Sequence, residues 1–305
     1  MSDYKRDIEL EKWHPRYLKK VDFETGEIVR GKPLYVFKPD NIGSKMCIDD
    51  KAIGHEGFTI MSNGETGKIA LMLESCKSEE VAQAVALFGK ELNKVQSISC
   101  DMAAGYLRVC ADELPKAKVV IDKFHVMQYV YDAVLDVRSR IKKELSAQLT
   151  KGKEKTERDR EILQLLDTLK YCRYRLTQPP EKWSEAGRDV MNQVFENHAE
   201  LKQAYLVSQE FKSWYNKVNC TKQRNQITEE LKGWYQKTKQ TELDEFKSVT
   251  RMIRKHEYEI INYFIKAQTN AIAERLNGKI NRFISNNYGF RDKDFALYRT
   301  AKYFS

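Results

Sequence analysis

The chain has 305 residues, of which 41% are hydrophobic and 32% are charged, a composition typical of a folded globular protein and not of a disordered one. Its formal net charge of +9 favours a polyanionic partner such as nucleic acid without establishing one. No apolar run approaches the ~18 residues of a membrane span, and the N-terminus lacks the apolar segment of a signal peptide. We therefore expect a cytoplasmic protein. Its six cysteines include no CxxC pair, which predicts free thiols and not a zinc ribbon.

The first half of the chain is predicted to form an N-terminal arm or small subdomain followed by the strands of a β-sheet. Residues 1–42 are polar and interrupted by prolines, which predicts an extended arm or a small subdomain. Three short β-type runs separated by turn residues then predict an antiparallel meander: KMCIDDKAI (45–53), GFTIMSN (57–63) and KIALMLES (68–75). The Gly-Lys pair in NGETGKIA is not a phosphate loop, because the preceding glycine and the following Ser or Thr are missing and the segment lies between two strands.

Strands and helices then alternate. The next segments in order are a helix (78–92), a strand QSISCD (96–101), a helix ended by Pro115 (103–114) and a strand AKVVID (117–122). Three antiparallel strands followed by strand–helix–strand units predict a mixed five-stranded sheet flanked by helices, an α/β fold. A purely helical scaffold is the alternative, and it would require residues 43–122 to contain no strands.

From residue 124 onward the pattern is helical. The predicted helices cover 125–149, 160–176, 182–198, 200–218 and, as one long last helix, 246–284. A charged link occupies 151–160, and a break is expected at Gln178-Pro179-Pro180. We expect Trp183, Trp214 and Trp234 to pack in the core of this part, with stacking on an unpaired base as the alternative.

Carboxylates stand where the apolar runs of the sheet end. Asp101 follows SISC, Asp122 follows KVVI, and the first strand contains Asp49 and Asp50, of which only one can point to a given face. In a sheet of this order the first and fourth strands are expected to be neighbours, so Asp49 and Asp101 could converge. A divalent cation would relieve the repulsion between two such carboxylates.

The last helix offers a third carboxylate. Glu274 has Asn270 and Asn277 about one turn to either side, a spacing that places all three on one helix face. Taken singly, each of these acidic residues is better explained as an ordinary strand end or a solvent-facing side chain.

Four segments change that balance when they are taken together and in order: IDDKAI, SCDMAAGY, LPKAKVVIDKFHV and TNAIAERLNGKINRFISNNYGFRDKDFALYR. In this combination they resemble successive motifs of bacterial insertion-sequence DDE transposases of the ISL3 class. The resemblance extends from about residue 41 to the C-terminus and is thin through the helical middle.

The resemblance implies an RNase H-like core with a large all-helical insertion before the last catalytic helix. The implied division is an N-terminal arm (1–42), the first part of the core (43–149), the helical insertion (150–250) and the last core helix with the C-terminal segment (251–305). The implied activity is metal-dependent DNA strand cleavage and strand transfer in transposition. By motif, Asp49 and Asp101 would be the catalytic aspartates and Glu274 the catalytic glutamate. Together they would bind two Mg²⁺ ions, for which Mn²⁺ substitutes.

Supporting roles follow by the same resemblance. Residues expected to orient the metal ligands or the substrate are Asp122, His125, Asn270 and Asn277. Because of their positive charge, and not by the resemblance, residues expected to contact the DNA backbone are Lys123, Lys279, Arg282 and Arg291; an ordinary solvent-facing helix surface explains each of them equally well alone. Asp50 stands where the family more often has a glutamate, and its side chain is expected to point away from the metals.

The implied partners are transposon ends and target DNA, bound by a homodimer in a nucleoid-associated, cytoplasmic setting. The family usually carries a DNA-recognition region ahead of its core, whereas only about 42 residues precede the core here, so we expect a separate polypeptide to recognise the ends or this copy to be truncated. Two alternatives keep the fold and change the function: a nuclease that cuts without joining, and an inactive remnant that binds DNA.

Overall fold

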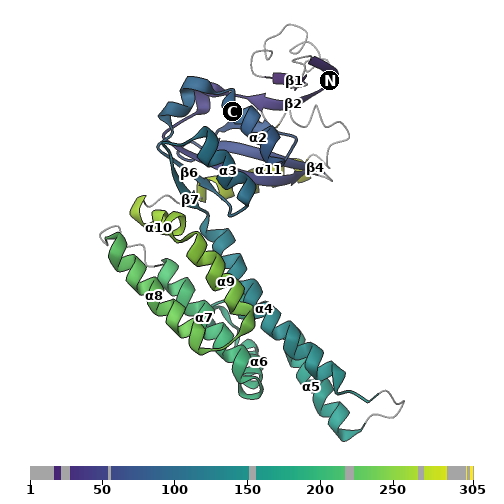
Figure 1. Cartoon of the computed structure of the whole chain (residues 1–305). Helices are drawn as coiled ribbons and strands as arrows, with labels where there is room; N and C mark the ends of the chain where they lie inside the picture. Colours follow the sequence, from purple (N-terminus) through teal and green to yellow (C-terminus); the bar gives the residue numbers. More distant parts are fainter. Residues whose placement is uncertain are drawn as a thin grey trace. The chain divides into compact units, whose positions relative to one another are not determined.

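The computed structural model describes residues 17–21, 28–53, 56–150, 156–216, 223–266, 271–286, 300 and 303–304. The chain divides into two compact units, shown in Figure 1. The sheet unit comprises Met1–Asp122 and Lys266–Ser305, and the helical unit comprises Lys123–Ile265. The predicted insertion at 150–250 lies inside the helical unit, which begins and ends outside those boundaries.

The sheet unit contains a single mixed sheet. Its strands are β1 (Tyr17–Val21), β2 (Ile28–Phe37), β3 (Lys45–Ile53), β4 (Glu56–Asn63), β5 (Ile69–Leu73), β6 (Ser97–Cys100) and β7 (Lys118–Ile121), in the spatial order β1-β2-β5-β4-β3-β6-β7. The last five in this order are the five predicted strands. Neighbouring strands from β1 to β3 are antiparallel, whereas β3, β6 and β7 run parallel.

The prediction did not foresee strands within residues 1–42. Part of this region continues the sheet, because β2 pairs antiparallel with β5 through Tyr35 and Leu73, Val36 and Met72, and Phe37 and Leu71. Pro33, which suggested an irregular arm, lies at a register shift between β1 and β2, where a residue without an N–H group is tolerated. The predicted five-stranded sheet therefore gains two strands beyond β5.

Helices cover both faces of this sheet. On one face Met46, Ile48 and Ile98 pack with Val81 of α2 (Ser78–Ala86) and Val109 of α3 (Ala104–Glu113). On the other face a second apolar cluster joins β4 and β5 to α11 (Ala271–Asn286); its members are Phe58, Ile60, Ile69, Met72, Leu276, Ile280 and Phe304. In β4, Ile60 belongs to the second cluster and Met61 to the first, as the period of a strand requires.

The helical unit consists of seven described helices. They are α4 (Lys123–Ala147), α5 (Glu157–Tyr171), α6 (Glu185–Asn197), α7 (Ala199–Asn216), α8 (Arg224–Gln240), α9 (Asp244–Lys255) and α10 (Glu257–Lys266). The helix α4 packs against α5, α7 and α9, and α7 packs against α8. Aromatic rings fill the interior: the Phe211 ring lies 4.6 Å from that of Trp234, and the Trp214 ring lies 4.7 Å from that of Phe264, measured between centroids.

Two helix predictions need correction. The single long helix expected over 246–284 is interrupted, because His256 leaves helical geometry with φ −112° and ψ 22° and separates α9 from α10. The helix α8 was not predicted, because its polar face outweighs the few apolar residues that it buries. The break after α5 is confirmed by two short 3₁₀ turns at Arg175–Thr177 and Pro180–Lys182.

Within the described residues, no helix is both long enough and apolar enough to cross a membrane.

Candidate active site

Asp49 lies on the face of the sheet that α11 covers. In β3 the side chains of Met46 and Ile48 belong to the core beneath α2 and α3, so Asp49 points to the opposite face. Its antiparallel partner in β4 is Ile60, which packs with Leu276 and Ile280 of α11. Directly paired residues share a face, so both observations place Asp49 on the α11 side.

Asp101 is level with Asp49 in the sheet. The parallel strands β3 and β6 pair Lys45 with Ser97, Met46 with Ile98 and Cys47 with Ser99. Two residues further along, the same register brings Asp49 beside Asp101, which directly follows the last residue of β6. The Asp101 carboxylate accepts a hydrogen bond from the Ala103 amide at 2.8 Å, which fixes the turn that leads into α3. The predicted adjacency of the first and fourth strands is confirmed.

Asp122 continues the same row. The register of β6 and β7 pairs Cys100 with Ile121, and the following residues are Asp101 and Asp122. The Asp122 amide donates to the Cys100 carbonyl at 2.8 Å, and the residue is only 5% exposed. Three carboxylates therefore lie side by side on three neighbouring parallel strands: Asp101 and Asp122 directly follow β6 and β7, and Asp49 lies level with them within the longer strand β3. The carboxyl ends of parallel strands form the edge at which open α/β sheets commonly bind ligands.

The negative charge of this row of carboxylates affects the pKa of the buried Cys47 thiol. Its pKa is raised to about 12, first by burial and then by the negative charges of Asp122 and Asp49. The thiol is therefore protonated at neutral pH, and it lies close enough to both carboxylates to sense them. Sequence reasoning missed Cys47, although its place two residues before Asp49 on the same strand face could have pointed to it.

Asp50 faces the opposite side of the sheet, as predicted. The Tyr106 hydroxyl of α3 donates a hydrogen bond to the Asp50 carboxylate, and it also lies 2.7 Å from the hydroxyl of the buried Thr59. Burial raises the pKa of Asp50, and the charges of Asp101 and Asp49 raise it further. This network ties β3 and β4 to the helix that begins directly after Asp101.

The third predicted carboxylate belongs to α11. Glu274 and Asn277 lie within this helix, but their side chains are outside what the structure describes, as are Asn270 and Arg291. The helix itself packs on the face that carries Asp49. Among the side chains that the structure does describe, no three His, Cys, Asp or Glu residues are grouped closely enough to hold a metal ion.

The predicted DNA contacts fall on both units. Lys279 and Arg282 are exposed on α11 in the sheet unit. In the helical unit, Lys123 opens α4 and its ammonium donates to the Asn216 side chain at 2.6 Å and lies over the Tyr215 ring at 5.4 Å. His125 makes an edge contact with the Phe124 ring, with centroids 5.6 Å apart.

The three tryptophans of the helical unit are core residues, as predicted. Trp183, Trp214 and Trp234 are each less than one tenth exposed. The indole N–H of Trp234 donates to the Val207 carbonyl at 2.9 Å, and that of Trp183 donates to the Arg175 carbonyl at 3.1 Å. Their rings are therefore not available for stacking on a base in this conformation.

The comparisons with known proteins agree with the motifs. The model of one protein family, the ISL3 class of DDE transposases, described as a transposase, matches residues 46–300. No curated protein and no solved structure shows significant similarity to the chain.

Proposed function

We propose that this chain, which belongs to the ISL3-class DDE transposase family, cleaves DNA strands and joins the freed ends of an insertion sequence to target DNA. The observation that carries the proposal is the register of β3 and β6, which brings Asp49 level with Asp101 on the face covered by α11. A family match alone would say nothing about whether this copy keeps its catalytic groups aligned.

We propose that the sheet unit is an RNase H-like core. What supports this is the mixed sheet formed by β3 to β7, in which the first and fourth of these strands are adjacent, with helices on both faces of the sheet. Of the residues proposed as catalytic, Asp49 then lies within β3 and Asp101 directly after β6, two strands that have a neighbour on each side, and Glu274 lies in α11.

The donor set fits a hard divalent cation. Asp49 and Asp101 supply carboxylate oxygens from adjacent strands, the ligand type that Mg²⁺ and Mn²⁺ prefer, and Glu274 is proposed as the third ligand. Two bound ions would activate the attacking water or 3′-hydroxyl and stabilise charge on the leaving oxygen. The hydrogen bond from the Ala103 amide holds the Asp101 carboxylate at the strand end.

The remaining predicted residues are proposed to support this site. Asp122, next in the row of carboxylates, would orient Asp101 or the substrate, together with His125, Asn270 and Asn277. The cations Lys123, Lys279, Arg282 and Arg291 would contact the DNA backbone. Pairing two transposon ends would require a homodimer.

The decisive experiment is Mn²⁺-dependent cleavage of a DNA end by the native chain and by Asp101→Asn. Asp112→Asn is the matched control, because Asp112 is an exposed carboxylate on α3, 58% accessible and paired with Arg108. We expect the Asp101 variant to lose cleavage and the control to retain it. Equal cleavage by all three proteins would disprove the proposed chemistry.

A second assay separates the transposase from a nuclease that cuts without joining. Pre-cleaved transposon ends with free 3′-hydroxyl groups are supplied together with a plasmid target. Joined products would support strand transfer, whereas cleavage without joining would support the nuclease. If the native chain neither cuts nor joins, Mn²⁺ binding that is lost in Asp101→Asn would still distinguish an intact metal site from an inactive remnant.

A further inference from the structure

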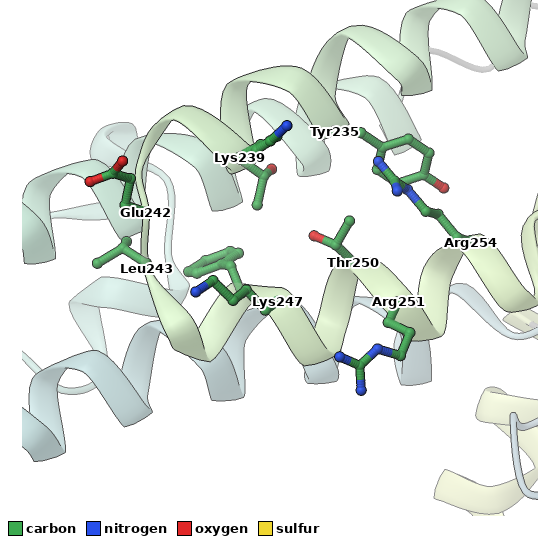
Figure 2. Close-up of a pocket in the computed structure, with 10 residues that line it drawn as sticks. Tyr235, Lys239, Glu242, Leu243, Lys247, Thr250, Arg251 and Arg254 are labelled. Carbon is green, nitrogen blue, oxygen red and sulfur yellow. The ribbon is translucent and has the colours of Figure 1, made fainter.

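The helical unit contains a cationic groove between α8 and α9 that the proposed chemistry does not use. Figure 2 shows this groove, a cavity of about 310 Å³. On α8 it is lined by Tyr235 and Lys239, which are four residues apart and so share a helix face. The other wall is α9, whose lining residues include Lys247, Thr250 and Arg254.

The sequence of α9 explains why one of its faces is cationic. Phe246, Val249 and Ile253 are buried in the unit, at the spacing of a single helix face. Lys247 and Arg254 fall outside that buried stripe, so both remain exposed along the groove. Arg251, also exposed, extends the same row of charge.

The positive charge of the groove is only partly compensated. Lys247 pairs with Asp244 one turn away, and the Arg254 guanidinium lies 4.6 Å from the centre of the Tyr235 ring. Figure 2 shows Arg254 beside Tyr235 at one end of the groove. Lys239 makes no ion pair with any residue in the described part of the chain. Glu242 is the one carboxylate among the described residues that line the groove, against four cations.

A second observation concerns a hydroxyl group in the wall of the groove. The Thr250 hydroxyl oxygen is buried and has no hydrogen-bond partner among the described residues, although Thr250 lines the groove. Figure 2 shows Thr250 between the two helices. A buried hydroxyl without a partner is destabilising, whereas an acceptor oxygen entering the groove would satisfy it.

We propose that the groove between α8 and α9 binds a phosphodiester of the DNA backbone. A phosphate oxygen would accept a hydrogen bond from Thr250, and its negative charge would be balanced by Lys239, Lys247 and Arg254. The choice of DNA as the polyanion rests on the proposed function. The contact would add affinity without reading base sequence, since phosphates are the same at every step of the duplex.

The test measures binding of a fluorescent duplex of arbitrary sequence by anisotropy, in EDTA, so that no cleavage takes part. The groove variant is Lys239→Gln with Lys247→Gln. Its control is Lys202→Gln with Lys232→Gln, because Lys202 is exposed on α7 and Lys232, like Lys247, pairs with an acid three residues away. Both double variants remove the same charge.

We expect the groove variant to bind roughly tenfold more weakly than the control and to lower the slope of log affinity against log salt by about 1 to 2. Equal affinities and slopes for the two double variants would overturn the proposal. So would a groove variant that loses binding of ATP while its affinity for DNA stays equal to that of the control, because the site would then belong to a free nucleotide.

The variant Thr250→Val tests the groove without changing its charge. It should weaken DNA binding while leaving the salt slope unchanged, and it should leave the thermal stability of the DNA-free protein equal or higher, since an unsatisfied hydroxyl is removed. Undiminished DNA binding by Thr250→Val would refute the role of the hydroxyl. Because the whole test runs without metal, it can succeed when Asp101→Asn shows the cleavage proposal to be wrong, and it can fail when cleavage is confirmed.

Discussion

The two units of this protein arrange their charged side chains in different ways. In the sheet unit, three carboxylates of like charge lie side by side, that of Asp49 within β3 and those of Asp101 and Asp122 directly after β6 and β7, and together with burial the charges of Asp122 and Asp49 raise the pKa of the Cys47 thiol. In the helical unit, the Arg140 guanidinium is met by three carboxylates, those of Glu144, Glu200 and Glu245. Opposite charges are paired in the helical unit, whereas like charges are grouped in the sheet unit, and a group of carboxylates favours the binding of a cation.

The interiors of the two units also differ in the kind of side chain that they pack. The sheet unit packs aliphatic side chains in two layers around a sheet whose register decides which residues meet. The helical unit packs aromatic rings, and its exposed surface includes the cationic groove. On this division the proposed chemistry belongs to the sheet unit, and the proposed backbone contacts belong to both units, the groove being the contribution of the helical unit. Four experiments test the contrast between the units.

The largest effect is expected from neighbouring aspartates on opposite faces of β3. Asp49→Asn should lower Mn²⁺-dependent cleavage by about 10³-fold, because losing a metal ligand removes several kcal/mol of transition-state stabilisation. Asp50→Asn should have a far smaller effect, because its side chain bonds Tyr106 on the other face. Rate measurements under single-turnover conditions would test the pair. Equal losses would mean that the faces have been assigned wrongly.

The next effect concerns the aromatic core of the helical unit. Phe211 is fully buried, so Phe211→Ala should destabilise this unit by about 3–5 kcal/mol. Leu206→Ala, on the same helix but 51% exposed, is the control and should change the unfolding free energy by less than about 1 kcal/mol. Three of the four tryptophans lie in this unit, so indole fluorescence during urea unfolding reports on it.

The same experiment tests whether the units unfold separately. Mn²⁺ affinity of the sheet unit, followed in parallel, should persist in Phe211→Ala at urea concentrations where the indole signal has already changed. Simultaneous loss of both signals would show that the two units unfold in one cooperative transition. The contrast between them would then be a difference in residue composition and not in independent stability.

Five of the strands and one key adjacency could be predicted from the sequence, because short β-type runs bounded by turn residues mark β3 to β7. That order already made β3 and β6 neighbours, which is why Asp49 and Asp101 could be paired in advance. The contacts of Cys47 and Tyr106 could not be predicted, since they depend on register and on where α3 lies. The groove could not be predicted either, because the sequence pattern did not predict α8. In addition, Glu242, between α8 and α9, adopts a left-handed φ of 57° that its residue type does not predict.

A smaller effect is expected within the sheet unit itself. Tyr106→Phe removes a hydroxyl that bonds both Asp50 and Thr59, and it should lower the unfolding free energy by about 1–3 kcal/mol. Tyr129→Phe is the control, because Tyr129 is 48% exposed on α4 of the other unit. Chemical denaturation followed by Mn²⁺ affinity would measure the difference. No difference between the two variants would show that the network around Asp50 is not a stabilising tie.

The smallest effect is one of pH, and it has opposite signs in the two units. In the helical unit, hydrogen bonds from Thr150 and Thr156 hold the pKa of Asp159 well below its usual range. Its contribution to stability is therefore present above the unfolded-state pKa of about 4 and is lost as the pH falls below that value. In the sheet unit, burial raises the pKa of Asp50, so folding favours its protonated form and its contribution to stability declines as the pH rises above about 4.

The measurement compares unfolding of the native chain, Asp159→Asn and Asp50→Asn across pH 3–7, followed by indole fluorescence and Mn²⁺ affinity. We expect each variant to flatten the pH dependence of stability in its own unit only. A response of one unit to the substitution in the other would show that protonation in one unit is coupled to folding of the other, and chemistry and binding could then no longer be assigned to separate parts of the chain.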